Sequence, residues 1–348
     1  MHLYHLNHPS NSTSGKLGFI ALTFIKSIFW HFEYDDNYDE STTSIQRIRR
    51  INLTIPIKSF RFVGSCNRLI CLVDIFSYPS SVLICNPITR EYVILPKINT
   101  YSIGFGYVSS TNHYKVVGIC VSKTGFVEVY IYTLGSGNGW RNLGKLNFEF
   151  NILNQHEAGI FANGALYWID SKLKMIITFD LAKEQFCEHI SPSPFPPDRD
   201  WCDARIWVLD GFLSFAIYIR VEGLGIHETW LLKNKNRNHD LKEAGEHQSL
   251  VWIKEFRVDD SNPLVVMKID SVLTYSGHCF SIYDTKTSTS KRLVKFNYAV
   301  FQVYPHHNTL VSLKELGEED TKVMVFVEIK ETISIDYSLE QLQEDGEP

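Results

Sequence analysis

Residues 59–96 read SFRFVGSCNRLICLVDIFSYPSSVLICNPITREYVILP and decide the fold. Turn-forming residues divide this stretch into four short apolar runs, at 61–63, 69–74, 81–85 and 91–95. The turn before the last run, NPITR at 86–90, combines an Asn, which tolerates tight turns, with a Pro, which removes a backbone donor. Apolar runs of about five residues between such breakers are typical of strands joined by hairpins. The stretch therefore predicts a small antiparallel sheet of about four strands.

The same unit recurs twice further along the chain, at 160–190 and 271–296. The matching turn residues are Asn86, Asp180 and Asp284, which lie 94 (180 − 86) and 104 (284 − 180) residues apart. A propeller blade occupies about 40–50 residues, so each gap has room for about two blades.

Two intervening pieces, 127–143 and 227–256, could supply the missing blades. Each contains a predicted hairpin that ends on a tryptophan, Trp140 and Trp252. No run of about 15 residues shows a helical period, whereas strand signals follow one another from 55 to 330. So many short strands need a closed or radially repeated sheet to remove their edges. We predict an all-β chain with a single β-propeller-like domain of about six to eight blades.

The predicted domain boundaries follow from composition. The propeller spans 17–333, residues 1–16 form a short preceding segment, and 334–348 form an acidic tail that is expected to fray. The polar stretch 33–44 is predicted as a mobile surface loop. The basic residues after it, Arg47, Arg49 and Arg50, fit a solvated face better than a patch for an acidic partner.

Composition limits the classes of function. Of the 348 residues, 44% are hydrophobic and 13% aromatic, which is typical of a globular protein. The formal charge of −5 argues against a general nucleic-acid binder. The N-terminus resembles no signal peptide, and the apolar run 17–25 is too short to span a membrane, so we expect it to form a strand or buried edge.

The chain contains an odd number of cysteines, seven, and they are widely scattered. Several lie inside predicted strands, which favours small buried apolar residues over a disulfide framework. We expect a reducing compartment, the cytoplasm, the nucleus or both. The seven are Cys66, Cys71, Cys85, Cys120, Cys187, Cys202 and Cys279.

Motifs for metals, phosphates and cofactors are weak or missing. There is no H-E-x-x-H, no cysteine pair with two intervening residues, and His306 and His307 would face opposite sides of a strand. The G-x-G at Gly104 and Gly106 lacks a third glycine and a following helix, and GSGNG at 135–139 lacks the end of a phosphate loop. We expect no metal or cofactor site. The block 101–122 is predicted as a short strand around Gly104 and Gly106, a turn at 109–112 and a second strand at 114–121, and both glycine motifs are interpreted as hairpin turns rather than ligand loops.

Three carboxylates could serve a propeller hydrolase: Asp170, Asp180 and Asp284. Their predicted turn positions favour Asx-turns instead, in which the side chain accepts backbone N–H groups. We therefore assign no catalytic residue.

The proline-rich stretch SPSPFPPDRDWCDAR at 191–205 is the main candidate for partner binding. Four prolines in seven residues disfavour a strand, and Arg199, Trp201 and Arg205 are of the types that often anchor protein interfaces. The alternative is a connector between blades, with Trp201 folded against the sheet.

Eight segments in order carry a family resemblance: GSCNRLICLVD, LICNPITREYVILP, IGFGYVSSTNHYKVVGI, VEVYIYTLGSGNGWRNL, IFANGALYWID, IITFDLAKEQFCEHI, ETWLLKN and VWIKEFRVD. Over roughly 55–300 the chain resembles the F-box-associated interaction domain of plant F-box proteins, most of all the S-locus F-box-like group. That resemblance implies a substrate receptor of an SCF-type E3 ubiquitin ligase. The family's F-box binds a Skp1-type adaptor, and its β-propeller-like domain binds the target protein.

The chain departs from the family pattern in three ways. The helical F-box is not found in it, and residues 2–9 resemble the segment that follows an F-box. Arg68 replaces the usual glycine of the GSCNGL turn, and Gly139 stands where a serine is frequent. We expect adaptor binding only if an F-box lies upstream. The alternatives are a decoy or scaffold without a ligase role and, less favoured, a propeller hydrolase.

Overall fold

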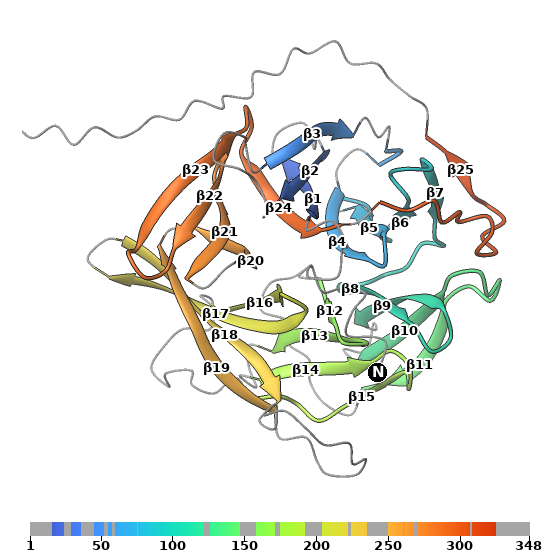
Figure 1. Cartoon of the computed structure of the whole chain (residues 1–348). Helices are drawn as coiled ribbons and strands as arrows, with labels where there is room; N and C mark the ends of the chain where they lie inside the picture. The colour runs from blue at the N-terminus through green and yellow to red at the C-terminus, as the bar shows by residue number, and fades with distance from the viewer. Residues whose placement is uncertain are drawn as a thin grey trace, which may run out of the picture.

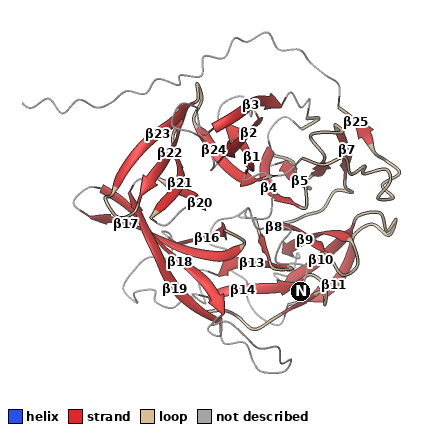
Figure 2. Ribbon diagram, in the orientation of Figure 1, coloured by secondary structure: helices blue, strands red, loops and turns tan. Residues whose placement is uncertain are grey.

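The computed structural model describes most of the chain. The described residues are 16–23, 29–35, 45–51, 55–57, 60–74, 76–121, 126–146, 158–170, 175–191, 204–221, 224–234, 250–259, 261–267, 270–306 and 308–324. Within them every regular element is a strand, and there is no helix (Figure 2). The strands form six antiparallel sheets arranged around a common axis (Figure 1), so the protein is a six-bladed β-propeller. Six is the lower end of the predicted range.

Five of the blades contain strands that are consecutive in sequence. Blade 1 has β4 (Phe60–Cys66), β5 (Leu69–Asp74), β6 (Val82–Cys85) and β7 (Glu91–Ile94). Blade 2 has β8 (Ser102–Val108), β9 (His113–Val121), β10 (Val127–Thr133) and β11 (Arg141–Lys145). Blade 3 has β12 (Ile160–Ala162), β13 (Ala165–Asp170), β14 (Met175–Asp180) and β15 (Gln185–Phe186). Blade 4 has β16 (Ala204–Leu209), β17 (Phe212–Val221), β18 (Leu224–Asn234) and β19 (Leu250–Asp259). Blade 5 has β20 (Asn262–Val266), β21 (Ser271–Ser276), β22 (Cys279–Asp284) and β23 (Thr289–Lys295).

Blade 6 closes the ring with strands from both ends of the sequence. Its innermost strand is β24 (Val300–Pro305), which pairs with β1 (Lys16–Thr23). The outer strands are β2 (Phe29–Asp35) and β3 (Ile45–Ile51). The apolar run at 17–25 is thus a buried strand up to Thr23, as expected. The predicted loop at 33–44 is wrong at its start, because β2 continues to Asp35 and Tyr34 is fully buried.

The core is divided among the six junctions between blades. Each of six hydrophobic clusters joins residues of two neighbouring blades. In β9, for example, Val116 belongs to the cluster shared with blade 1 and Val117 to the cluster shared with blade 3. A strand of this kind is buried on both faces, which explains why β5 reads as a continuous apolar run, LICLVD, rather than an alternating one.

Glycines in β8 allow blade 3 to approach closely. A Cβ atom added at Gly104 would lie 2.6 Å from Leu166 Cδ1, and one at Gly106 would overlap Phe161 and Leu181. Above them the indole Nε1 of Trp168 donates to Ser102 Oγ at 2.9 Å. The short strand predicted around Gly104 and Gly106 is confirmed as β8, whereas the hairpin-turn interpretation of the G-x-G is wrong, because the two glycines serve the packing of this strand.

The turn predictions at 86–90 and 135–139 are confirmed. Asn86 Oδ1 accepts the backbone N–H of Ile88 at 2.9 Å, and the glycines at 135, 137 and 139 all have positive φ. The turn residues Asn86, Asp180 and Asp284 end or follow the third strands of blades 1, 3 and 5, so each gap does contain about two blades.

The two hairpin tryptophans make equivalent contacts between blades. Trp140 Nε1 donates to Pro96 O at 2.7 Å, and Trp252 Nε1 donates to Ser191 O at 2.9 Å. Each bond joins the outer part of one blade to the connection that leaves the previous blade.

Antiparallel pairing divides the connections between two rims. Successive connections alternate between the ends of a blade, so the loop from second to third strand lies at the same end as the connection to the next blade. We call this end the crossover rim. The other end carries the turns from first to second and from third to fourth strand, and we call it the turn rim. In blade 1 the backbone bonds between Ser80 and Ile98 join a loop to a connection at the crossover rim.

Candidate functional site

The structure places the predicted binding stretch only in part. Arg199 and Trp201 lie outside the described residues. Arg205 is exposed on β16, the innermost strand of blade 4, and Ser191 lies in the segment after β15. Because 191–205 connects blade 3 to blade 4, its described ends lie at the crossover rim. The assignment of these three residues to partner binding stays a prediction.

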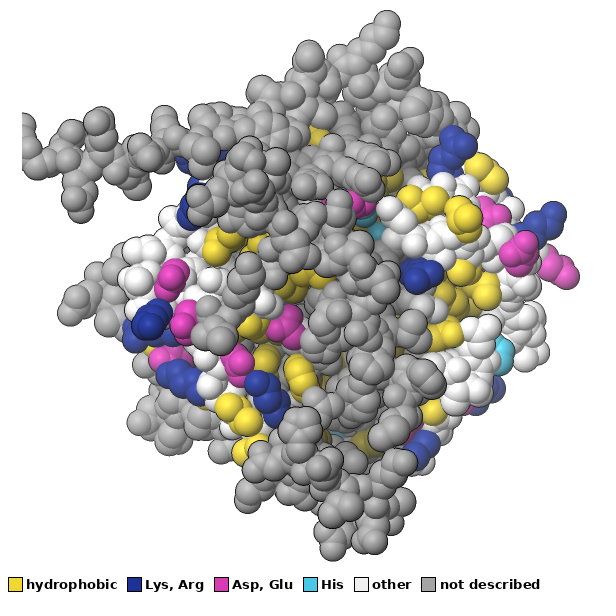
Figure 3. Space-filling model, in the orientation of Figure 1, with side chains coloured by type: hydrophobic (Ala, Val, Ile, Leu, Met, Phe, Trp, Pro, Cys, Tyr) yellow, Lys and Arg dark blue, Asp and Glu magenta, His cyan; other side chains and the backbone are white. Residues whose placement is uncertain are grey.

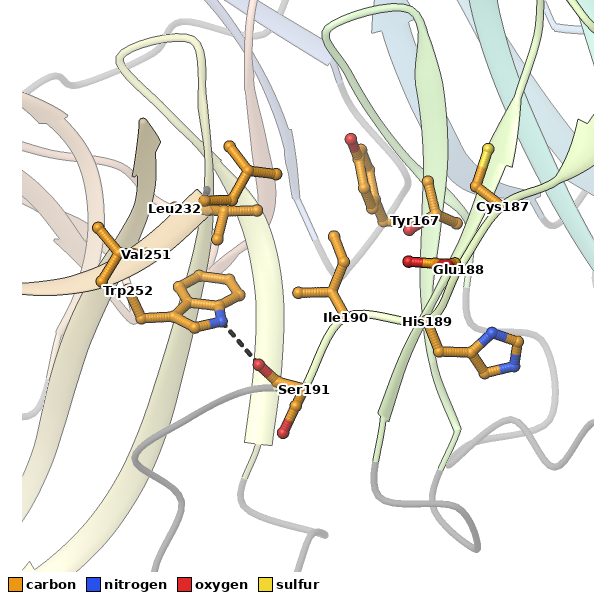
Figure 4. A pocket seen from close by; sticks show the side chains of 11 residues that line it. Tyr167, Cys187, Glu188, His189, Ile190, Ser191, Leu232, Val251 and Trp252 are labelled. Atoms are coloured by element: carbon orange, nitrogen blue, oxygen red, sulfur yellow. Dashed lines mark hydrogen bonds between the residues drawn. The ribbon is translucent and has the colours of Figure 1, made fainter. Parts of the chain in front are cut away.

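A pocket of about 560 Å³ lies between blades 3 and 4 and includes the start of that stretch. Figure 4 shows Trp252 closing one side through its bond to Ser191 O, with Ile190 between Leu232 and Tyr167. Thr178 Oγ1, a buried polar atom of the lining, has no hydrogen-bond partner among the described residues. The lining residues are Tyr167, Thr178, Cys187, Glu188, His189, Ile190, Ser191, Leu232, Leu250, Val251 and Trp252.

A second pocket, of about 240 Å³, lies at the crossover rim between blades 1 and 2. Its lining includes two aromatic side chains from the β5–β6 loop, Phe76 and Tyr78, which are 82% and 78% exposed. Hydrogen bonds hold this loop, since Phe76 N donates to Asp74 Oδ1 at 3.0 Å and Ser77 Oγ donates to Pro79 O at 2.7 Å. Exposed aromatics on a held loop are typical of interface anchors, because little ordering is needed on binding.

The loop lies within the stretch 59–96 that predicts the first sheet, but its two aromatics were not among the predicted binding residues. IFSYPSS combines two aromatic residues with a proline between two predicted strands, and that composition was the available signal. Their exposure follows only from the packing, since aromatics of similar loops and strands are buried elsewhere in this chain.

The three candidate carboxylates do not meet at one place. Asp180 Oδ1 accepts the backbone N–H of Lys183 at 2.8 Å, and Asp284 Oδ1 accepts those of Lys286 and Thr287, both at 2.9 Å. These backbone hydrogen bonds lower the pKa of Asp284. Both residues thus form the predicted turns on the turn rim of different blades. Asp170, by contrast, is a fully buried residue at the opposite end of its blade. The loop that follows it lies outside the described residues, so its Asx-turn stays a prediction.

The described cysteines are free, and the four that are buried are unsuited to nucleophilic chemistry. Cys66, Cys71, Cys85 and Cys120 are buried, whereas Cys187 and Cys279 are half-buried. Burial raises the pKa of Cys85 and of Cys120 to about 12, so their thiols stay protonated at neutral pH. Cys202 lies outside the described residues.

The described ranges contain neither a metal-binding cluster nor a membrane-spanning helix. No group of three His, Cys, Asp or Glu side chains there could hold a metal ion. None of the elements described in those ranges is a helix long and apolar enough to cross a membrane.

One network of charges joins blades 2 and 3. The buried Lys115 Nζ donates to Leu181 O and to Glu184 Oε1, each at 2.8 Å, and Arg141 bonds the other oxygen of Glu184. Burial raises the pKa of Glu184, but the hydrogen bonds from Arg141 and Lys115 outweigh it, so the pKa of this carboxyl is lowered. All three charges are satisfied within the fold, which indicates a structural role.

The fold is that of a β-propeller with one pocket at the crossover rim between blades 1 and 2 and another between blades 3 and 4. Comparison with known proteins gives the family: residues 20–202 match the F-box associated beta propeller domain. The chain belongs to this family. The resemblance was expected over roughly 55–300, and the match begins earlier and ends earlier than that.

Curated relatives come from Arabidopsis thaliana. F-box protein At3g07870 is 28% identical over 250 residues, covering 61% of this chain and 55% of the relative. F-box/kelch-repeat protein At3g23880 is 26% identical over 187 residues, covering 50% of this chain and 49% of the relative. The chain spans about half the length of the curated relatives it matches.

Solved structures are less similar. TolB from Acinetobacter baumannii matches with a TM-score of 0.45 at 12% identity, covering 84% of this chain and 66% of that one. The periplasmic gluconolactonase PpgL of Pseudomonas aeruginosa matches with a TM-score of 0.38 at 9% identity, covering 84% and 98%. Likenesses at this level carry no conclusion about function.

Proposed function

We propose that this chain is the substrate-recognition module of an SCF-type E3 ubiquitin ligase and that it acts by binding a target protein. Membership of the F-box associated family and similarity to plant F-box proteins support this function. The observation that carries it in the structure is the pair Phe76 and Tyr78, exposed beside a pocket on a hydrogen-bonded loop. The carboxylates that a hydrolase would need lie at separate places, which favours binding over catalysis.

The adaptor contact belongs to an F-box, so we propose that a Skp1-type adaptor joins only when an F-box precedes this domain. The alternative is a decoy that binds the same target protein without belonging to a ligase. The decoy would differ from the ligase subunit only in lacking the contact with the adaptor. The genomic sequence upstream of the Met1 codon distinguishes the two. The buried free thiols support placement in the cytoplasm or the nucleus, which a fluorescent fusion would test.

The decisive experiment compares this chain alone with the same chain joined behind the F-box of At3g07870, expressed in plant cells. We expect the adaptor to co-purify with the fusion and not with the chain alone. Proteins that become ubiquitinated with the fusion should lose that modification in the double variant Phe76→Ala, Tyr78→Ala. Both side chains are exposed, so the variant should melt close to the wild type.

Two results would count against this function. One is a fusion that binds the adaptor but changes the ubiquitination of no other protein. The other is target modification that is unaffected by the double variant, which would remove the β5–β6 loop from the binding surface. The matched control is Leu310→Ala, a change of another highly exposed apolar side chain, on the turn rim.

A further inference from the structure

The outermost strand of blade 4 presents an open edge. β19 pairs with β18 on one side, and in the part of the chain that the structure describes no strand pairs with its other side. Three large apolar side chains on this strand are exposed, Leu250, Val251 and Ile253. An outer strand of about ten residues with exposed apolar side chains is a ready template for another strand, unless it is covered.

Blade 1 shows how this fold covers such an edge. Its outer strand β7 takes a fifth antiparallel strand, β25 (Lys322–Val323), from far along the chain. The next residue, Met324, donates its backbone N–H to Arg90 O at 2.9 Å and buries its side chain in the cluster between blades 6 and 1. An added strand here combines backbone pairing with one buried apolar anchor.

Blade 4 has both features, an unpaired strand edge and a place for an apolar anchor, and no described residue occupies either of them. The pocket of about 560 Å³ lies beside the start of β19, and Leu250 and Val251 line it. Its volume is enough for a large side chain such as Leu, Met or Phe. Thr178, a residue that is 7% exposed, lines the same pocket, and its Oγ1 has no hydrogen-bond partner in the part of the chain that the structure describes.

Charge at the pocket favours one kind of occupant. Glu188 is exposed and points toward the space between the blades in Figure 4, whereas His189 points away from it. No ion pair of Glu188 occurs among the described residues.

The nearby charges on β19 are already matched, because Lys254 bonds Glu228 at 3.0 Å and Glu255 bonds Lys233 at 2.7 Å. The unmatched carboxylate of Glu188 therefore complements a lysine or arginine on the partner.

We infer that an extended peptide of a partner protein adds to the outer edge of β19 as a fifth strand, places a bulky apolar side chain in the pocket between blades 3 and 4, and directs a basic residue to Glu188. This inference rests on the proposed protein-binding function and names a second surface for it, distinct from the β5–β6 loop. Strand addition obtains affinity from backbone hydrogen bonds and specificity from side-chain pockets.

The test uses a displayed library of random peptides of about a dozen residues, selected on the full chain. We expect the selected peptides to share one bulky apolar residue with a Lys or Arg close to it. A synthetic peptide of that consensus should bind at least about tenfold more weakly to Glu188→Lys and to Val251→Lys. It should bind Leu310→Lys, a change at a more exposed apolar site elsewhere, as it binds the wild type.

Backbone methylation of the same peptide tests the strand itself. Methyl groups on alternate backbone nitrogens should reduce binding about tenfold or more in one register and much less in the other, because only every second N–H of an added strand faces β19. All protein variants lie at exposed positions, and their melting curves should overlay that of the wild type.

The contrary outcomes are separable from failure of the proposed function. If no peptide is selected, if Glu188→Lys and Val251→Lys bind the peptide normally, or if methylation in neither register weakens binding, strand addition at β19 is wrong. The ubiquitination assay that depends on Phe76 and Tyr78 could still succeed in each of these cases. If instead the fusion changes the ubiquitination of no protein while the peptide results are as expected, the ligase role is wrong and the peptide site on β19 still stands.

Discussion

Residues with a left-handed backbone, that is with positive φ, form the turns between the first and second strands of the blades. Three such turns have nearly the same pair of φ angles: 40° and 75° at Asn67-Arg68, 49° and 80° at Asn163-Gly164, and 50° and 79° at Asp210-Gly211. Glycine adopts such a φ at no steric cost, and Asn and Asp tolerate it better than most residues. Blade 1 departs from the pattern, because Arg68 stands at the glycine position.

Arg68→Gly should therefore stabilise the protein. The left-handed conformation costs an L-residue about 1–2 kcal/mol, and glycine's greater freedom in the unfolded chain offsets part of the gain. We expect a net increase of about 0.5–1 kcal/mol in the free energy of unfolding, measured in urea. The reverse change Gly164→Arg should destabilise by a similar amount, since a Cβ there would meet no atom within 4 Å and only backbone strain is added. A destabilised Arg68→Gly variant would contradict this account.

Asp210 in the turn of blade 4 makes stability depend on pH. Burial raises its pKa, the hydrogen bond from the backbone of Val266 lowers it, and the charge of Glu255 raises it, with a result of about 6 against the usual 3.8. Because the folded pKa is above the unfolded one, this group stabilises the fold most below pH 3.8, and the contribution is lost as pH rises through about 6.

Asp210→Asn should remove that dependence. Asparagine keeps the turn, as at the equivalent Asn67 and Asn163, and carries no charge to bury. At pH 7 we expect the variant to be more stable than the wild type by about 2–3 kcal/mol, from about two pKa units, and at pH 4 the difference should be small. Urea unfolding at both pH values measures it, and an equal difference at pH 4 and pH 7 would show that the effect is not titration of Asp210.

At the scale of elements, the packing of whole strands depends on small residues at the junctions. Strand β8 approaches blade 3 because Gly104 and Gly106 leave room for side chains of β12 and β13 and of the turn after β14. The facing residues Leu166 and Trp168 are buried and in contact on other sides, so they have little room to move.

Gly104→Ala should destabilise the protein by about 1–3 kcal/mol, as overpacking of a core usually does. The added methyl would lie 2.6 Å from Leu166 Cδ1 and 3.1 Å from Trp168 Cζ2. Gly64→Ala is the matched control, because this glycine also lies on an innermost strand but a Cβ there meets no atom within 4 Å. Urea unfolding should separate the two variants, and equal stabilities would contradict the packing role of β8.

At the scale of the whole molecule, two devices hold the ring. One is blade 6, where β24 pairs with β1. The other is the segment 308–324, which we call the strap and which crosses the turn rim of blade 1. Asn86 Nδ2 donates to Val311 O at 2.7 Å, and the carboxylate of Glu91 accepts from Ser312 Oγ at 2.8 Å and Leu313 N at 2.7 Å. The strap thus fastens the end of the ring onto its first complete blade.

Glu91→Ala should loosen the strap. It leaves the backbone N–H of the buried Leu313 without its acceptor, which costs about 1–3 kcal/mol. Hydrogen exchange should rise across 308–324 more than elsewhere. Glu315→Ala, an exposed carboxylate on the same strap, is the control and should leave exchange unchanged. Unaltered exchange in Glu91→Ala would show that the strap is held by other contacts.

The strands, the turns at 86–90 and 135–139, and the repeat of the blade unit were all predictable from the sequence. These features depend on neighbouring residues, because a turn needs its Asn, Pro or Gly and a strand needs its apolar run. The repeat then favoured an all-β ring of blades, because radial repetition leaves only short strand edges to protect. The family resemblance, too, is carried by those local motifs in their order.

Only the tertiary structure decided how the ring closes and which surface is left open. Asn86 and Glu91 each form a hydrogen bond with a residue of the strap that lies more than 200 positions further along the chain. Nothing in the neighbouring sequence indicates either pairing. The exposure of Phe76 and Tyr78 and the open edge of β19 depend on where neighbouring blades end. A sequence records which side chains are apolar, whereas burial depends on the atoms that other blades bring beside them.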